Sequence, residues 1–173
     1  MNDDILRLAA AIAAVLLLLG IYLWIRRPWS KRQPKFTTEA SRAIAFARVE
    51  AGRLGSRAIE PTHILMGLLH VPLPALLQFI PLDEHEPIRQ EIREHVSAGQ
   101  ELAKNEDIPF SEESSHVLVA AAREAKGLSA RQIGAEHLLL GLLHSESSLA
   151  ARILRERELR LEAVRARLGG WQE

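Results

Sequence analysis

Four of the seven histidines recur at one spacing, and histidine is a common metal ligand and general base. His63 and His70 form one i, i+7 pair, and His137 and His144 form another. On a helix this spacing is two turns, which places the rings of a pair on one face about 10 Å apart. Zinc binds nitrogen at about 2.0–2.1 Å, so neither pair can hold one ion. We therefore expect these histidines to cap or pack helix ends, and we expect no metal site.

Serine and carboxylate clusters give no stronger sign of catalysis. The serines lie outside any G-x-S-x-G motif, which places a nucleophile on a strand-to-helix turn. Glu112 and Glu113 are adjacent at an expected helix start, where carboxylates stabilise the helix dipole. The chain has no cysteine, which excludes thiolate nucleophiles, disulfides and cysteine-based clusters. We expect neither an enzyme nor a cofactor-binding protein, and no small-molecule substrate.

The charges balance in total but are divided unevenly along the chain. Residues 1–35 contain six Lys or Arg and two Asp or Glu, so this segment carries +4. The other 16 basic and 20 acidic residues give residues 36–173 a charge of −4. Binding to a phosphate backbone needs a clustered basic face, so nucleic acid is not an expected partner.

The N-terminal segment has the pattern of a membrane anchor. Residues 8–25 contain no charge, and ten of these eighteen residues are Leu, Ile or Val. As a helix they would rise about 27 Å, close to the roughly 30 Å thickness of the bilayer core. An acidic N-terminus and a missing small-residue cleavage site argue against a signal peptide, and a buried soluble helix would need a polar stripe. We expect a single-pass helix flanked by interface residues, namely Tyr22, Trp24, Arg26, Arg27 and Trp29.

The distribution of basic residues predicts the orientation of this anchor. Residues 26–35 contain five Lys or Arg, whereas residues 1–7 contain one. By the positive-inside rule, we expect the short N-terminus to lie outside and the C-terminal domain to be cytoplasmic. The membrane that we expect is a bacterial inner membrane.

The rest of the chain contains an internal duplication. Residues 36–70 align with residues 110–144 without a gap, and fifteen of the thirty-five positions are identical. Average residue usage would give about three. Each copy begins with an expected N-cap, Thr37 or Ser111, and continues with apolar residues at helical spacing. Gly55 and Gly127 lie where this first helix is expected to end.

Each copy is expected to contain three further helices. The second helices are predicted at residues 61–70 and 135–144. The remaining helices are predicted at residues 73–79 and 86–96 in the first copy, and at residues 148–156 and 161–168 in the second. The expected fold class is therefore all-α, with two tandem four-helix repeats and one preceding transmembrane helix.

The repeated residues resemble a known family. The pattern that begins with Phe36-Thr37 and reaches His63-Ile64-Leu65-Met66-Gly67-Leu68-Leu69 is similar to the Clp N-terminal repeat domain, which precedes the AAA+ motors of Clp unfoldases. The likeness covers residues 36–169 and departs after His70, where Val71-Pro72-Leu73-Pro74 replaces the family's acidic turn. It implies a pseudo-two-fold docking domain, related to chaperones and regulated proteolysis, that receives adaptor and client proteins.

The resemblance bears on two properties of the family, namely ATPase activity and the recognition of phosphorylated arginine. The sequence has no G-x-x-x-x-G-K-[ST] phosphate loop, so we expect a stand-alone domain without ATPase activity. In some Clp proteins, the acidic residue before the second-helix histidine helps to recognise phosphorylated arginine. This position is Glu136 in the second copy but Thr62 in the first. Glu136 is therefore the one peptide-binding residue that the resemblance implies.

The expected organisation divides the chain into segments. These are a tail (1–7), a transmembrane helix (8–25), a basic tether (26–35), repeat 1 (36–96), a linker (97–109), repeat 2 (110–169) and a second tail (170–173). The expected function is docking of adaptor or client polypeptides at a membrane, in concert with a separate Clp unfoldase or protease. The alternative is a membrane-tethered scaffold or regulator for one unrelated partner.

Overall fold

A computed structural model describes residues 35–70, 74–96, 99–103 and 107–170 of the chain. Within these ranges, no helix has the length and apolar character needed to cross a bilayer. The predicted transmembrane helix at residues 8–25 lies outside the described residues, and so do Tyr22, Trp24, Arg26, Arg27 and Trp29.

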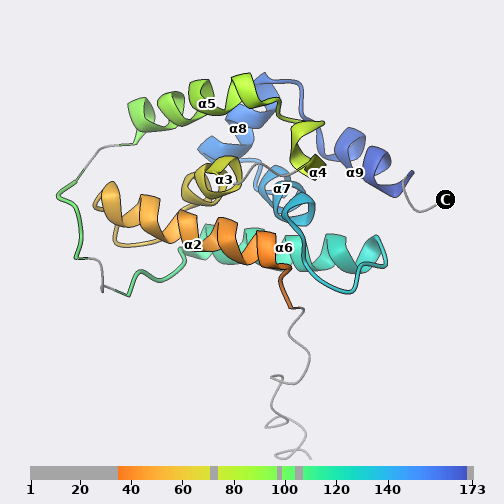
Figure 1. Cartoon of the computed structure of the whole chain (residues 1–173), viewed down its shortest axis with the longest axis horizontal. Helices are drawn as coiled ribbons and strands as arrows, with labels where there is room; N and C mark the ends of the chain where they lie inside the picture. The colour runs from red at the N-terminus through yellow and green to blue at the C-terminus, as the bar shows by residue number, and fades with distance from the viewer. Residues whose placement is uncertain (1–34, 71–73, 97–98, 104–106, 171–173) are drawn as a thin grey trace, which may run out of the picture. The chain divides into compact units, whose positions relative to one another are not determined.

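The described residues are all-helical, as predicted, and contain eight helices. Figure 1 shows α2 and α6 in one layer, α3 and α7 in the middle, and the later helices of each repeat above them. The helices are α2 (Thr38–Arg53), α3 (Pro61–His70), α4 (Pro74–Leu77), α5 (Leu82–His95), α6 (Glu112–Gly127), α7 (Ala135–His144), α8 (Leu149–Glu156) and α9 (Leu161–Gly169).

The first helix of each repeat begins in the same way. The Thr37 hydroxyl accepts a hydrogen bond from the Ala40 N–H at 3.1 Å, and Ser111 accepts one from Ser114 at 3.1 Å. Each cap satisfies an N–H that has no partner within the helix. The two predicted N-caps are therefore confirmed.

The ends of the first helices also correspond, although the residue with the left-handed backbone is a glycine in repeat 1 and a serine in repeat 2. Gly55 follows α2 with φ +67°, and its counterpart after α6 is Ser129 with φ 54°. α6 ends at Gly127, as predicted, and the residue with the left-handed backbone is Ser129, two positions later. In repeat 1 the glycine also permits a close approach, since a Cβ on Gly55 would lie 2.5 Å from the Gln100 carbonyl oxygen.

Glycine brings the first two helices of each repeat into contact. A Cβ on Gly67 would lie 2.0 Å from the Ala43 carbonyl oxygen, and a Cβ on Gly141 would lie 2.4 Å from that of Val117. The α2–α3 and α6–α7 crossings are therefore equivalent and closer than any side chain would allow. The middle helices α3 and α7 are buried almost throughout and form the centre of the core.

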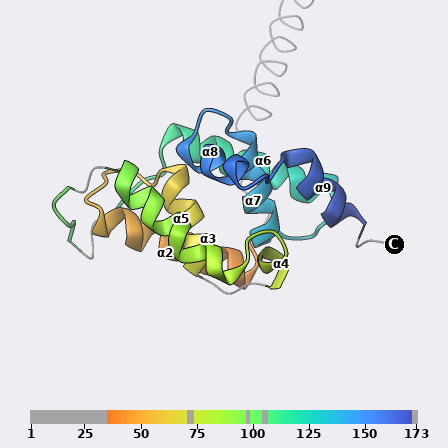
Figure 2. The same cartoon turned by 90° about the horizontal axis from the view of Figure 1, so that it is seen from above.

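The two repeats are joined by reciprocal backbone pairing. Phe36 forms a parallel bridge with Ile133, and the duplicated residues Ile59 and Phe110 form the matching bridge. Ile133 donates to the Lys35 carbonyl at 2.9 Å, and Ile59 donates to that of Pro109 at 2.7 Å. Phe36 corresponds to Phe110 and Ile59 to Ile133, so exchanging the two repeats converts one bridge into the other. A pseudo-two-fold axis between the repeats has this property. Figure 2 shows the two halves side by side from above.

Repeat 1 departs from prediction after α3. The helix predicted at residues 73–79 spans only Pro74–Leu77, and the helix predicted from residue 86 begins at Leu82. Pro87 therefore lies inside α5, where it removes one backbone hydrogen bond. The additional N-terminal turn buries His85, whose two ring nitrogens lie 3.0 Å from the Leu69 carbonyl oxygen and 3.1 Å from that of Ile80.

Candidate functional site

The predicted site residue Glu136 lies at the rim of a hollow of about 260 Å³. It is the second residue of α7, and its side chain is 28% exposed. We call this space the Glu136 hollow. Its lining residues are Ala75, Gln78, Leu128, Ala130, Glu136, His137 and Leu168. The walls are mainly apolar and come from both repeats, with one carboxylate among them.

The Glu136 carboxylate folds back over the residue that precedes α7. Its Oε1 atom lies 3.2 Å from Nδ1 of His137. A Cβ on Gly134 would lie 2.1 Å from that oxygen and 2.4 Å from Oε2. The carboxylate therefore occupies the volume that a side chain at position 134 would need.

His137 fixes the start of α7 and limits its own charge. Its Nδ1 atom accepts a hydrogen bond from the Gly134 N–H at 2.9 Å, so the proton of the neutral ring is on Nε2. Burial lowers the pKa of His137, although the nearby carboxylates of Glu136 and Glu124 act in the opposite direction. The hollow thus combines an acidic acceptor, a neutral imidazole and apolar walls, which suits a cationic group on an apolar stem.

Repeat 1 has the same helix cap without the acid. The Glu60 N–H donates to Nδ1 of His63 at 2.9 Å, and burial lowers the pKa of His63 to about 4. Thr62 occupies the position that corresponds to Glu136, and it is 6% exposed. The Nε2 atom of His63 is buried and has no partner among the described residues. The two repeats therefore share a capping histidine but differ at the candidate site.

A second polar cluster joins three helices of repeat 2. Arg165 on α9 donates to both oxygens of Glu124 on α6, at 2.9 and 2.6 Å, and Nε2 of His144 lies 2.6 Å from Oε1. The Arg165 hydrogen bonds, with that of His144, lower the pKa of Glu124 to about 2 although burial acts against them. Sequence reasoning missed this cluster, although Glu50 and Glu124 are identical at one position of the duplication.

The corresponding residues of repeat 1 are arranged differently. Glu50 pairs with Arg53 at 3.1 Å, and His70 packs on Phe46 with ring centroids 3.8 Å apart. On α5, Glu86 pairs with Arg89 and Arg93, both at 2.9 Å. These two cations lower the pKa of Glu86.

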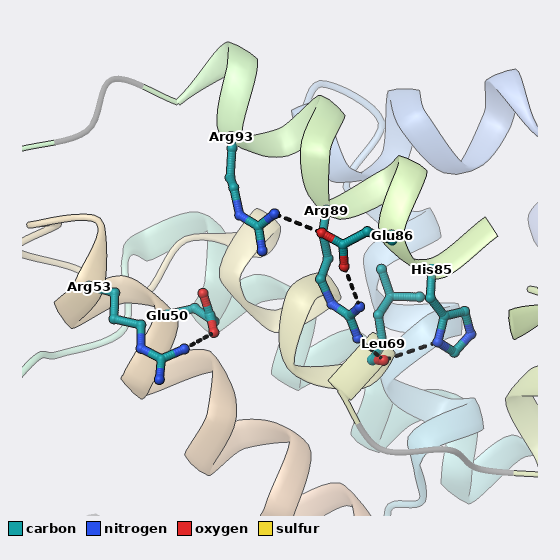
Figure 3. Close-up of polar contacts among 7 residues, drawn as sticks. All are labelled: Glu50, Arg53, Leu69, His85, Glu86, Arg89 and Arg93. Atoms are coloured by element: carbon teal, nitrogen blue, oxygen red, sulfur yellow. Dashed lines mark hydrogen bonds and ion pairs between the residues drawn. The ribbon is translucent and has the colours of Figure 1, made fainter. Parts of the chain in front are cut away.

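The end of α3 is capped by side chains from α5. Figure 3 shows Arg89 and His85 converging on the Leu69 carbonyl oxygen, which is one of the oxygens left free at the end of a helix. We interpret this cluster as a structural cap.

Arg157, which follows α8, links the repeats. It contacts Glu84 and Glu91 of α5, each at 3.0 Å.

A larger hollow, of about 580 Å³, lies between α6 and the segment that follows α7. Here the Ser145 hydroxyl donates to the Glu113 carboxylate at 2.8 Å. Across the described ranges, no serine hydroxyl is bonded to a histidine ring, and no group of three acidic or histidine side chains is placed to hold a metal ion.

The fold defines a class of protein, namely a duplicated, all-helical domain. The sequence pattern of the Clp repeat (R) N-terminal domain matches residues 35–157. The chain belongs to this family.

Known relatives agree with this assignment. The chain is 32% identical over 134 residues to the negative regulator of genetic competence ClpC/MecB of Bacillus subtilis, a match that covers 76% of this chain and 16% of that protein. The chain thus spans about one sixth of the length of the curated relatives it matches.

Solved structures show the same fold. The N-terminal domain of the Clp-associated chaperone ClpD from Arabidopsis thaliana is 27% identical with a TM-score of 0.59, covering 80% of this chain and 94% of that one. A chain from a malarial protein secretion system is 25% identical with a TM-score of 0.69, covering 78% and 92%. The Hsp104 N-terminal domain from Candida albicans, at 17% identity and a TM-score of 0.61, shares the fold, covering 78% and 89%.

Proposed function

We propose that this domain binds client or adaptor polypeptides through the Glu136 hollow and has no ATPase activity of its own. The family membership supports a binding role, because the N-domains of Clp unfoldases receive adaptors and substrates. The observation that carries the proposal is the Glu136 carboxylate, which is partly exposed at the rim of a mainly apolar hollow. A guanidinium group could pair with this carboxylate while its methylene stem lies against Leu128 and Leu168.

The chemistry of the hollow suggests which side chain it prefers. Phosphorylated arginine, which the family resemblance implies, keeps nitrogen donors for Glu136 and adds an anionic group. The Gln78 side chain lines the same hollow, and its amide can donate to phosphate oxygens. An unmodified arginine does not need this donor, so the modified residue should bind more tightly.

A binding measurement tests this function. A fluorescent peptide with one phosphoarginine is titrated with the full chain in mild detergent, alongside peptides with arginine or phosphoserine. Glu136→Gln removes the charge but keeps the shape, and should weaken phosphoarginine binding about tenfold or more. Glu39→Gln on the first turn of α2 is the control, since Glu39 is exposed and outside the hollow. Equal affinity of wild type and Glu136→Gln would refute the role of this site.

We also propose that residues 8–25 anchor the domain to a bacterial inner membrane. The uncharged run, the aromatic residues after it and the basic residues at 26–35 support this, with the domain facing the cytoplasm. Confinement to a membrane would raise the local concentration of clients for a separate Clp unfoldase or protease. Protease digestion of sealed, right-side-out vesicles tests the orientation. Cleavage of the helical domain by external protease would refute it.

A further inference from the structure

The two repeats differ in the pair of residues that surround the start of their second helix. In repeat 2, Gly134 precedes α7 and Glu136 is the second residue of that helix. In repeat 1, Glu60 precedes α3 and Thr62 is the second residue. The acidic residue therefore lies two positions earlier in repeat 1 than in repeat 2. In repeat 1 it occupies the position before the helix, where repeat 2 has a glycine.

The glycine at position 134 is not required by the backbone. Its φ of −90° and ψ of 177° are ordinary extended values that any residue can adopt. Its Cα hydrogens, however, face the Glu136 carboxylate, and an added Cβ would lie 2.1 Å from Oε1. Carbon and oxygen atoms that are not bonded stay more than about 3 Å apart, so a methyl group at position 134 would force the flexible Glu136 side chain to move its carboxylate away from its present place.

Repeat 1 avoids the same clash with the opposite arrangement, because it has a side chain before the helix and no carboxylate at the second helical position. Its helix start has the same cap, because His63 accepts from the Glu60 N–H as His137 accepts from the Gly134 N–H. Glu60 therefore places a Cβ where repeat 2 has the carboxylate of Glu136. The residue at the second helical position is then a short, buried threonine, Thr62.

We propose that Gly134 determines specificity by leaving room for the Glu136 carboxylate, so that the domain binds one guanidinium-type side chain through repeat 2. This inference rests on the proposed function for its ligand, but the steric coupling between positions 134 and 136 can be measured without ligand. Gly134 is a positioning residue, since it does not itself supply a group to the ligand.

A double-mutant cycle separates positioning from a general structural role. Affinity for the phosphoarginine peptide is measured for the full chain in mild detergent with wild type, Gly134→Ala, Glu136→Gln and the double variant. Gly134→Ala should weaken binding about tenfold, because the carboxylate is displaced. Glu136→Gln should then lower the affinity for the peptide about tenfold in wild type but less than twofold in the Gly134→Ala variant. Additive effects would overturn the inference.

The matched control is another glycine-to-alanine change. A Cβ on Gly127, at the end of α6, would meet nothing within 4 Å. Gly127→Ala should leave both affinity and the Glu136→Gln effect unchanged. If it weakens binding as much as Gly134→Ala, the steric explanation is overturned.

A measurement without ligand distinguishes failure of the inference from failure of the proposed function. The Glu136 carboxylate favours the charged form of His137, so its displacement should lower the midpoint of the His137 NMR titration in Gly134→Ala. A lowered midpoint with no peptide binding to wild type supports the positioning and overturns the proposed function. An unchanged midpoint overturns the positioning, whatever the peptide result.

Discussion

Glu50 and Glu124 provide a matched pair for testing how the repeats are stabilised. Each is 8% exposed at the same position of its repeat. Glu124 receives two hydrogen bonds from Arg165 and one from His144, whereas Glu50 pairs with Arg53, whose side chain is 61% exposed. We predict that Glu124→Gln destabilises the domain far more than Glu50→Gln, and that Glu124→Gln also changes how stability depends on pH.

The expected size follows from the pKa of Glu124. Its fall from 4.5 to about 2, caused first by the Arg165 hydrogen bonds, corresponds to about 3 kcal/mol at roughly 1.4 kcal/mol per tenfold change in proton affinity. The Arg165 side chain is 41% exposed, so solvent screening reduces the contribution to about 1–2 kcal/mol. Glu50→Gln should cost less than about 1 kcal/mol.

The sign of the pH dependence is also defined. Below pH 4.5 the unfolded Glu124 carboxyl takes up a proton while the folded one remains ionised, so its contribution is complete above that pH and is lost as pH falls through about 2. Urea unfolding of the full chain in mild detergent at pH 7 and pH 3 measures this directly. The difference in free energy of unfolding between wild type and Glu124→Gln should be about half as large at pH 3 as at pH 7.

Two results would refute this reasoning. If Glu124→Gln and Glu50→Gln lower the free energy of unfolding equally at pH 7, the pairing of Arg165 with Glu124 contributes nothing to stability. A gap that stays constant between pH 7 and pH 3 would mean that Glu124 has an ordinary proton affinity when folded.

Four further predictions concern other parts of the fold. Gly67→Ala places a Cβ 2.0 Å from the Ala43 carbonyl oxygen and should cost about 3 kcal/mol or more, seen as a lower melting temperature, whereas Gly127→Ala should not destabilise. His63 should remain neutral by NMR down to about pH 4, and stability should fall as pH drops from 6.5 towards 4, because the unfolded ring is protonated first; a midpoint near 6.5 contradicts this. Ser129→Gly should stabilise the domain by up to about 1 kcal/mol, since a serine with φ 54° is strained; a loss in urea unfolding would argue against strain. Arg157→Ala should cost about 1 kcal/mol by leaving Glu84 and Glu91 unpaired, and a cost no larger than that of the exposed Arg152→Ala would show the link between repeats to be negligible.

Local patterns in the sequence were enough to predict much of the fold. The second helices span residues 61–70 and 135–144 as predicted, and Thr37 and Ser111 cap the first helices. These features depend on hydrophobic spacing and on cap residues that lie a few positions apart in the sequence. Because the sequence is duplicated, each pattern occurs in both repeats and supports the same prediction twice.

Features that depend on distant contacts were not predicted. The start of α5 at Leu82 follows from burial of His85 against α3, which overrides the preference of Pro87 for a first turn. The pairing of Glu124 with Arg165 joins residues 41 positions apart, and spacing within one helix carries no sign of it. The Glu136 hollow depends in the same way on α4 and α9, so the sequence indicated the acidic residue but not the walls around it.

The reciprocal bridges between the repeats have a consequence for how the chain is made. Thr37 donates its N–H to the Ile133 carbonyl, so this N–H has no backbone partner within the domain until about a hundred further residues have left the ribosome. A nascent chain that ends within the linker therefore holds an unfinished half with exposed apolar helices. We expect such intermediates to need shielding during translation, and completion of the fold to await the second half.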